Sequence, residues 1–218
     1  TLQKPSVRAI KQLKRLRKER RFMVDQRARL TQKISEAAYH DADMELITQY
    51  YQQQIDLLSR QIKSIEQQIQ TLIESNPDLN HRYKQIRTAP GIGKVIGCFW
   101  LSLYAGEDQL NPRQISSRFG FAPHPYQSGT SVKGRQRSSG FGNGDMRRIM
   151  HQAARSVATH HEHYKAYYQR KLAEGKDEKL IMNNIINKII RTVSSMWNNN
   201  VDYDPGYIQE MKKIHQAA

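Results

Sequence analysis

Three things are scarce in this chain of 218 residues: cysteine, long apolar runs and acidic side chains. Cys98 is the only cysteine, which excludes an internal disulfide and a cysteine-based zinc site. No uninterrupted apolar run is long enough for a membrane span, and the mean hydropathy is -0.79. The start, Thr1 to Pro5, shows neither a secretory signal nor an initiator methionine. We therefore expect a cytoplasmic, nucleoid-associated chain without a membrane partner, and a fragment of a larger protein.

The shortage of acidic residues leaves a strong positive charge. Thirty-five Lys and Arg face 20 Asp and Glu, which gives a formal net charge of +15. Such an excess favours a polyanionic partner, most simply DNA or RNA.

Much of the charge lies in the first segment, from Pro5 to about residue 38, which is expected to be helical. One-sided charge on a helix repels itself unless a polyanion lies along it, although a charge run is more often a solvated face. We interpret this helix as nucleic-acid-facing, with Lys14, Arg17, Arg20 and Arg21 as candidate contacts.

The next segment, Met44 to Glu74, carries an apolar stripe whose spacing from Ile55 onward alternates between three and four residues. This is the pattern of a coiled-coil seam, with the first helix or another subunit as its partner. We predict an antiparallel hairpin of the two helices with its tip near Asp41.

A helix restart at Ser75-Asn76-Pro77 separates this hairpin from the rest. We expect a mainly α fold with three parts: a basic coiled-coil helical hairpin over 1–76, a compact helical domain over 77–207, and a tail over 208–218.

The compact domain contains Pro90-Gly91-Ile92-Gly93-Lys94 between two helical segments. A helix, a glycine turn and a second helix resemble a helix-hairpin-helix element, in which backbone N–H groups at a helix N-terminus can hold a phosphate. Gly91, Gly93 and Lys94 are therefore candidate contacts. A plain helix pair joined by glycines is the alternative.

A loop from Tyr126 to Gly140 is rich in serine, glycine and cations, and its alternating residues could form a small β-hairpin. Hydroxyls beside cations suit a phosphodiester site. From composition alone, a solvated turn that only touches a nucleic-acid backbone is the better interpretation. The candidate phosphate contacts here and in the following helix are Gly129, Thr130, Ser131, Lys133, Arg135, Arg137, Arg147 and Arg148.

Other clusters are weaker candidates. His160, His161 and His163 point to different helix faces, so joint metal coordination is geometrically poor. Asp202 and Asp204 lie in an expected loop without further ligands. We predict no metal site in this chain.

Four motifs in order resemble the DEDD-type insertion-sequence transposases and recombinases, a bridge-RNA-guided family related to the pilin-gene invertases. They are the Pro90 to Gly93 turn, Arg118 to Pro123, Ser128 to Gly134, and Gly142-Asn143 followed by Arg147-Arg148 and Ala153-Ala154. The resemblance is good over about 77–207 and weak over the coiled coil.

The resemblance implies an enzyme that cleaves and rejoins DNA through a covalent link to Ser128. It also implies an element-encoded guide RNA and assembly as dimers or tetramers through the coiled coil. Magnesium is expected on the carboxylates of an N-terminal nuclease-like domain that this sequence does not include, so the chain alone should bind without cutting.

Within the loop, Ser131, Ser138 and Ser139 are rival nucleophiles, and no obvious base lies near Ser128 in the sequence. A non-catalytic DNA- or RNA-binding module of a larger protein is the alternative function.

Overall fold

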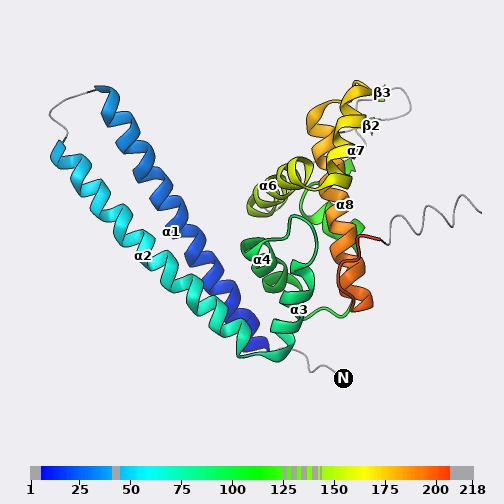
Figure 1. The fold of residues 1–218 in the computed structure, drawn as a ribbon, viewed down its shortest axis with the longest axis horizontal. Helices are drawn as coiled ribbons and strands as arrows, with labels where there is room; N and C mark the ends of the chain where they lie inside the picture. The colour runs from blue at the N-terminus through cyan, green and yellow to red at the C-terminus, as the bar shows by residue number, and fades with distance from the viewer. Residues whose placement is uncertain are drawn as a thin grey trace, which may run out of the picture. The chain divides into compact units, whose positions relative to one another are not determined.

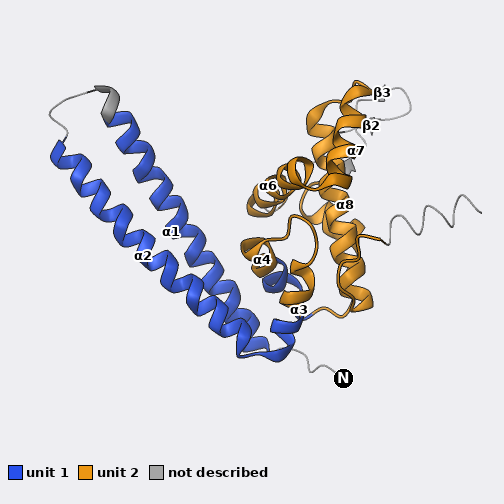
Figure 2. Cartoon of the chain, viewed as in Figure 1, with its two compact units in different colours: residues 1–81, 100–106 blue, residues 82–99, 107–218 orange. Residues whose placement is uncertain are grey.

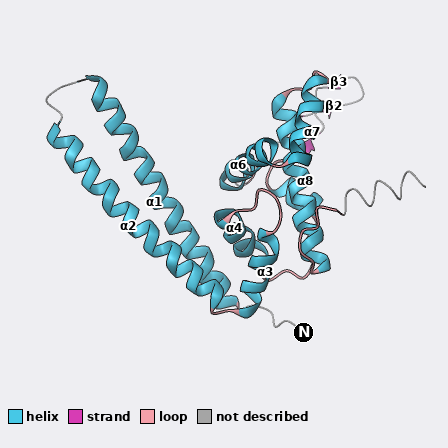
Figure 3. Ribbon diagram, in the orientation of Figure 1, coloured by secondary structure: helices cyan, strands magenta, loops and turns pink. Residues whose placement is uncertain are grey.

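A computed structural model describes residues 6–40, 45–124, 127–128, 132–133, 137–138, 142 and 144–206. The backbone, but not the side chains, is described for 38–40 and for the short strands between 123 and 138. The described residues are almost entirely helical (Figures 1 and 3), and the mainly α prediction is confirmed.

The helices follow in chain order with short connections. They are α1 (Val7–His40), α2 (Glu45–Glu74), α3 (Pro77–Arg87), α4 (Lys94–Tyr104), α5 (Pro112–Arg118), α6 (Gly144–His160), α7 (Glu162–Ala173) and α8 (Glu178–Asn199). Four two-residue strands lie between α5 and α6: β1 (Pro123–His124), β2 (Gln127–Ser128), β3 (Val132–Lys133) and β4 (Arg137–Ser138).

The chain divides into two compact units, coloured in Figure 2. One unit comprises residues 1–81 and 100–106, and the other comprises 82–99 and 107–218. The division runs through α3 and α4. The domain limits expected from the sequence remain predictions.

In the first unit, α1 and α2 pack along each other (Figure 1). Arg20 pairs with Glu66, Arg27 with Ser59, and Lys33 with the ring of Tyr51. The partner number falls as the α1 number rises, so the two helices run antiparallel.

Few side chains of this helix pair are fully buried. Ile62, Ile69 and Ile73 are the buried residues of α2, and Leu13 of α1 is fully buried. The seam therefore ends on Ile73 rather than on its expected neighbour Leu72, and Ile47 at the other end of the stripe is 39% exposed.

The second unit is built around α8, which packs against α5, α6 and α7. Its apolar residues repeat at helical spacing, and Ile185, Ile189 and Ile190 are at most 1% exposed. Asp177 caps the helix by accepting from the backbone N–H groups of Lys179 and Leu180.

The end of α8 is fixed by polar contacts with residues far away in the sequence. The indole N–H of Trp197 donates to the carbonyl of Glu107 at 3.1 Å, and Asn198 bonds the backbone N–H and carbonyl of Leu110. The guanidinium of Arg82 lies 4.7 Å from the centre of the Trp197 ring and donates to the Trp197 carbonyl. Burial lowers the pKa of Arg82, while the charge of Asp108 opposes that shift. The segments before α5 are thus tied to α8.

Candidate functional site

The serine loop, residues 123–141, leaves the helical unit through a tight turn after α5. Asn111 caps α5 by accepting from the backbone N–H groups of Arg113 and Gln114. At the other end, Gly120 has φ +73°, a conformation that glycine adopts without strain. The next backbone N–H, of Phe121, donates to the carbonyl of Ser116 at 2.8 Å. The chain is thereby directed into β1.

Helix α8 holds this point of departure. The side-chain amide of Asn183 donates to the carbonyl of Phe121 at 3.0 Å, and that of Asn187 donates to the same carbonyl at 3.5 Å. Phe121 itself is 1% exposed. Sequence reasoning missed both asparagines. The available signal was their i, i+4 spacing within a helix otherwise rich in isoleucine.

The loop returns to the same place at Gly142. This residue has φ +133°, and a Cβ built on it would lie 2.8 Å from the carbonyl oxygen of Arg118 and 2.8 Å from the carbonyl carbon of Phe119. Only glycine fits beside that backbone. Both ends of the serine loop are therefore anchored at the end of α5.

Between these anchors the described strands form two antiparallel pairs. β1 pairs with β4, and within that interval β2 pairs with β3. Ser128 lies opposite Val132, and Gln127 lies opposite Lys133, so the backbones of Ser128 and Lys133 are neighbours in one ladder. Arg137 lies in β4, opposite His124. Gly129, Thr130, Ser131 and Arg135 lie outside the described residues.

The turn between α3 and α4 packs against α6. Gly91 has φ +78°, and a Cβ there would lie 2.8 Å from Val157 and 3.2 Å from the carbonyl oxygen of Ala153. Gly93 and Lys94 are exposed, and a Cβ on Gly93 would have nothing within 4 Å. Gly91 thus brings backbone and α6 together, whereas Gly93 and the first residue of α4 face outward.

Helix α6 carries a row of cationic and ionisable side chains. Arg147 is half-buried, and its Nε has no hydrogen-bond partner in the described part of the chain, while Arg148 is exposed. His151 and Arg155 follow at one-turn intervals from Arg147, which places all three along one side of the helix. The sequence prediction stopped at Arg148, although this spacing was readable.

His151 links the row to the base of the serine loop. Its ring meets that of Phe121 edge-on at 6.1 Å. Partial burial of the imidazole, followed by the charges of Arg155 and Arg147, lowers the pKa of His151. The side chain is therefore mostly neutral near neutral pH, and an anion bound to the row would favour its protonation.

The other histidines do not form a metal site with one another in the structure as described. His161 precedes α7 and makes edge contacts with Tyr164 and Tyr203, while His163 contacts Tyr164 from the other side of the turn. Across the described residues, no three His, Cys, Asp or Glu side chains come together as metal ligands.

The candidate cations of α1 belong to the other compact unit. Lys14 is exposed, whereas Arg17, Arg20 and Arg21 are half-buried. Arg20 pairs with Glu66 at 2.6 Å, and Arg21 pairs with Asp25 at 2.8 Å. Two of the four predicted contacts are thus partly neutralised within the protein. No described helix is long and apolar enough to cross a membrane.

The helix–glycine turn–helix element, the anchored serine loop and the cationic helix α6 form a continuous part of the sequence, and known proteins share it. Residues 83–169 match the model of the transposase IS116/IS110/IS902 family. This range runs from α3 into α7.

Two curated relatives extend the similarity. The pilin gene-inverting protein of Moraxella bovis is 28% identical over 188 residues, covering 85% of this chain and 56% of the relative. That of Moraxella lacunata is 27% identical with the same coverage. The chain thus spans about half the length of these relatives. The matches support the transposase and recombinase family that the sequence motifs indicated.

Proposed function

We propose that this chain is part of a DNA transposase or site-specific recombinase that cleaves and rejoins DNA, with Ser128 as the nucleophile. The observation that carries the proposal is the family match over residues 83–169, which contains the whole serine loop. The relatives that align with this chain are named for inverting a gene, which also involves breaking and rejoining DNA.

In the proposed reaction, the Ser128 hydroxyl attacks a backbone phosphorus. A bond forms between its oxygen and phosphorus, the bond from phosphorus to one deoxyribose oxygen breaks, and that sugar oxygen takes up a proton. The phosphoserine link preserves the phosphodiester energy, so attack by another sugar hydroxyl rejoins the strand and releases the serine.

The surrounding cations suit this chemistry. Lys133 is beside Ser128 in the ladder, and Arg147 and Arg148 begin the helix that follows the loop. Positive charge on the phosphate oxygens stabilises the extra negative charge of the transition state. We propose that Arg135, Arg137 and the loop residues Gly129, Thr130 and Ser131 complete this phosphate site.

The exposed start of α4 is proposed as a second backbone contact. The first turn of α4 carries no acidic side chain, and it begins with the exposed Lys94. A phosphate there would accept from unpaired backbone N–H groups and be stabilised by the helix dipole. This is the helix-hairpin-helix mode of DNA contact.

Guide RNA, self-association and magnesium complete the proposal for the full enzyme. The net charge of +15 supports an RNA partner as well as DNA. Exposed apolar side chains on the helix pair, namely Phe22, Leu46, Tyr50 and Leu57, support dimers or tetramers through α1 and α2. The described residues do not fit a magnesium site, so we place that ion on carboxylates elsewhere in the complete enzyme.

The test is covalent trapping on a nicked suicide DNA substrate with the full-length protein, its guide RNA and magnesium. Ser128→Ala should abolish the protein–DNA adduct while DNA affinity stays within about threefold of wild type, because one hydroxyl contributes one bond to binding but the whole covalent step to chemistry. Denaturing electrophoresis detects the adduct, and peptide mass mapping locates it.

Ser131→Ala and Ser138→Ala are the matched controls and should retain adduct formation. An adduct on another serine, or undiminished cleavage by Ser128→Ala, would overturn the assignment. Binding without any adduct in the wild-type protein would instead support a non-catalytic nucleic-acid-binding module.

A further inference from the structure

A groove of about 450 Å³ lies along the helix pair of α1 and α2. Its polar lining consists of Arg20, Arg27, Ser59, Arg60, Lys63 and Glu66. We call it the basic groove. All of these residues belong to one compact unit, and four of the six are cations.

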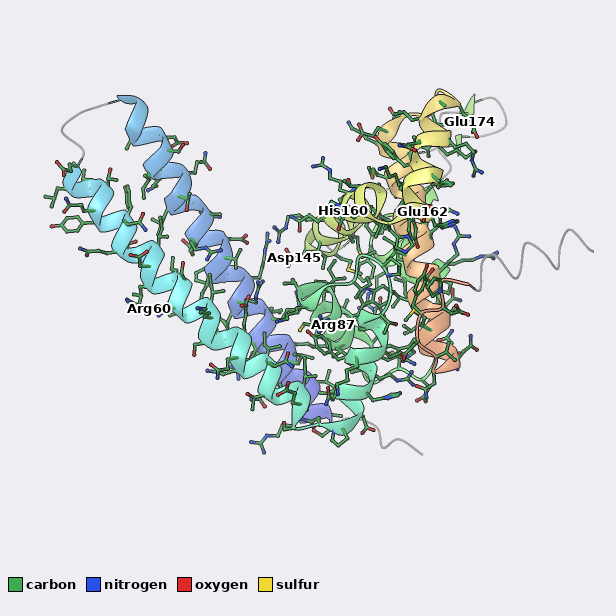
Figure 4. The ribbon with its side chains drawn as sticks, in the orientation of Figure 1. Arg60, Arg87, Asp145, His160, Glu162 and Glu174 are labelled. Carbon is green, nitrogen blue, oxygen red and sulfur yellow. The ribbon has the colours of Figure 1, made fainter. Side chains whose placement is uncertain are left out.

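The cations of α2 are concentrated here. Arg60 and Lys63 are the only Lys or Arg among the 30 residues of α2, a helix that is otherwise rich in glutamine and carries four acidic residues. Both line the basic groove, opposite two arginines of α1 (Figure 4 labels Arg60). A solvated surface would give no reason for this coincidence.

Most of this charge is not neutralised within the protein. Glu66 pairs with Arg20 at 2.6 Å, and Arg27 donates to the hydroxyl of Ser59 at 3.3 Å. Arg60 and Lys63 are exposed and form no ion pair with any described residue. Three positive charges therefore face one groove without a carboxylate of their own.

A second groove on the same helix pair provides an internal comparison. It measures about 500 Å³ and is lined by Gln12, Ser64, Gln67, Gln68, Thr71 and Ser75, with Leu72 as its apolar residue. No charged side chain lines it. The shape of the coiled coil alone thus produces neutral grooves, and the basic groove differs from its neighbour in charge rather than in size.

We infer that the basic groove binds backbone phosphates of duplex DNA. Guanidinium and ammonium groups match phosphate oxygens, and Arg27 is held in place by Ser59. No aromatic side chain lines the groove, so it offers no stacking platform for single-stranded bases. This inference rests on the DNA partner of the proposed function and assigns that partner a second contact, away from the serine loop in sequence.

The test is the salt dependence of duplex affinity for Arg60→Gln with Lys63→Gln. Glutamine keeps helix propensity, and both positions are exposed, so the fold should persist. Each lost phosphate contact should reduce the slope of log affinity against log salt by about one and weaken binding roughly tenfold at 0.1 M salt. Fluorescence anisotropy with a duplex of random sequence measures both, and circular dichroism checks helicity.

Lys18→Gln with Arg29→Gln is the matched control, because it removes two exposed cations of α1 that do not line the groove. We expect less than a threefold loss for this pair. Glu66→Gln is the converse variant: it removes the one carboxylate of the groove and frees Arg20, so duplex affinity should rise and the salt slope should steepen by about one.

Equal losses for the groove pair and the control pair would overturn the inference, as would an effect on RNA hairpins but not on duplex DNA. Loss of self-association without loss of DNA affinity would also overturn it. The adduct at Ser128, measured at saturating DNA, tests the proposed function separately. A groove variant that still forms the adduct leaves that function intact whatever its affinity.

Discussion

The two compact units differ in how much of their helices they bury. In α8, ten of 22 residues are buried, whereas in α2 the buried residues are three of 30. The unit around α8 thus has a continuous core, while the helix pair depends on a narrow seam and leaves most of its surface exposed. The difference separates two tasks: the core fixes the ends of the serine loop, and the helix pair offers a long surface to partners.

The largest expected effect tests this contrast with one type of substitution in both units. Ile189→Ala in α8 removes a side chain that is 1% exposed and should cost about 2–5 kcal/mol of unfolding free energy. Ile65→Ala in α2 removes a half-buried side chain and should cost about half as much. Urea unfolding monitored by circular dichroism measures both, and Trp197 fluorescence in a Trp100→Phe background reports on the α8 unit alone.

Similar losses at the two positions would break the comparison, because they would mean that the seam is as well packed as the core. Loss of the Trp197 signal at the same urea concentration in both variants would show that the units unfold together.

An intermediate effect is expected at the return point of the serine loop. Gly142→Ala places a Cβ against the backbone of Arg118 and Phe119 in a conformation that alanine avoids, so we expect a loss of about 1–3 kcal/mol. Gly144→Ala is the control, because a Cβ there meets nothing within 4 Å. Thermal unfolding measures stability, and the adduct assay measures the loop. Equal melting temperatures for the two variants would contradict the anchoring role of Gly142.

The smallest effect concerns His151 and pH. Its pKa is lowered in the folded protein, so between that value and its ordinary 6.5 the unfolded chain binds more protons. The associated loss of stability is absent above about pH 6.5 and grows as pH falls toward the folded pKa. Proton NMR of the His151 ring should show a midpoint below 6.5 that rises on adding duplex DNA. Arg155→Gln should raise it without DNA, and a midpoint unaffected by DNA would place His151 away from the bound phosphates.

The sequence predicted elements whose signals are local. Asn111-Pro112 marked the start of α5, Asn76-Pro77 marked that of α3, and the isoleucine spacing predicted α8. Side-chain capping and helical periodicity act over a few residues, so they can be read without knowing the fold.

Contacts between distant residues could not be read in the same way. Asn183 and Asn187 bond a carbonyl 62 and 66 residues away, and Arg27 meets Ser59 only because the two helices adopt one register. Leu72 and Ile73 are both apolar, and only the packing decides which of them the seam buries. For the candidate site, the motifs predicted which residues matter, whereas the supports of the loop required the structure.

The shared anchoring of the serine loop has a consequence for how such a segment can change. Its two ends meet the same three backbone positions, Arg118 to Gly120 at Gly142 and the adjoining Phe121 at the other end. Closing a loop between fixed ends costs only about 0.6 kcal/mol for each doubling of its length. The interval between Ala122 and Gly142 is therefore an exchangeable cassette: insertions, deletions or a segment grafted from a relative can alter its chemistry while the helices that carry it keep their sequence.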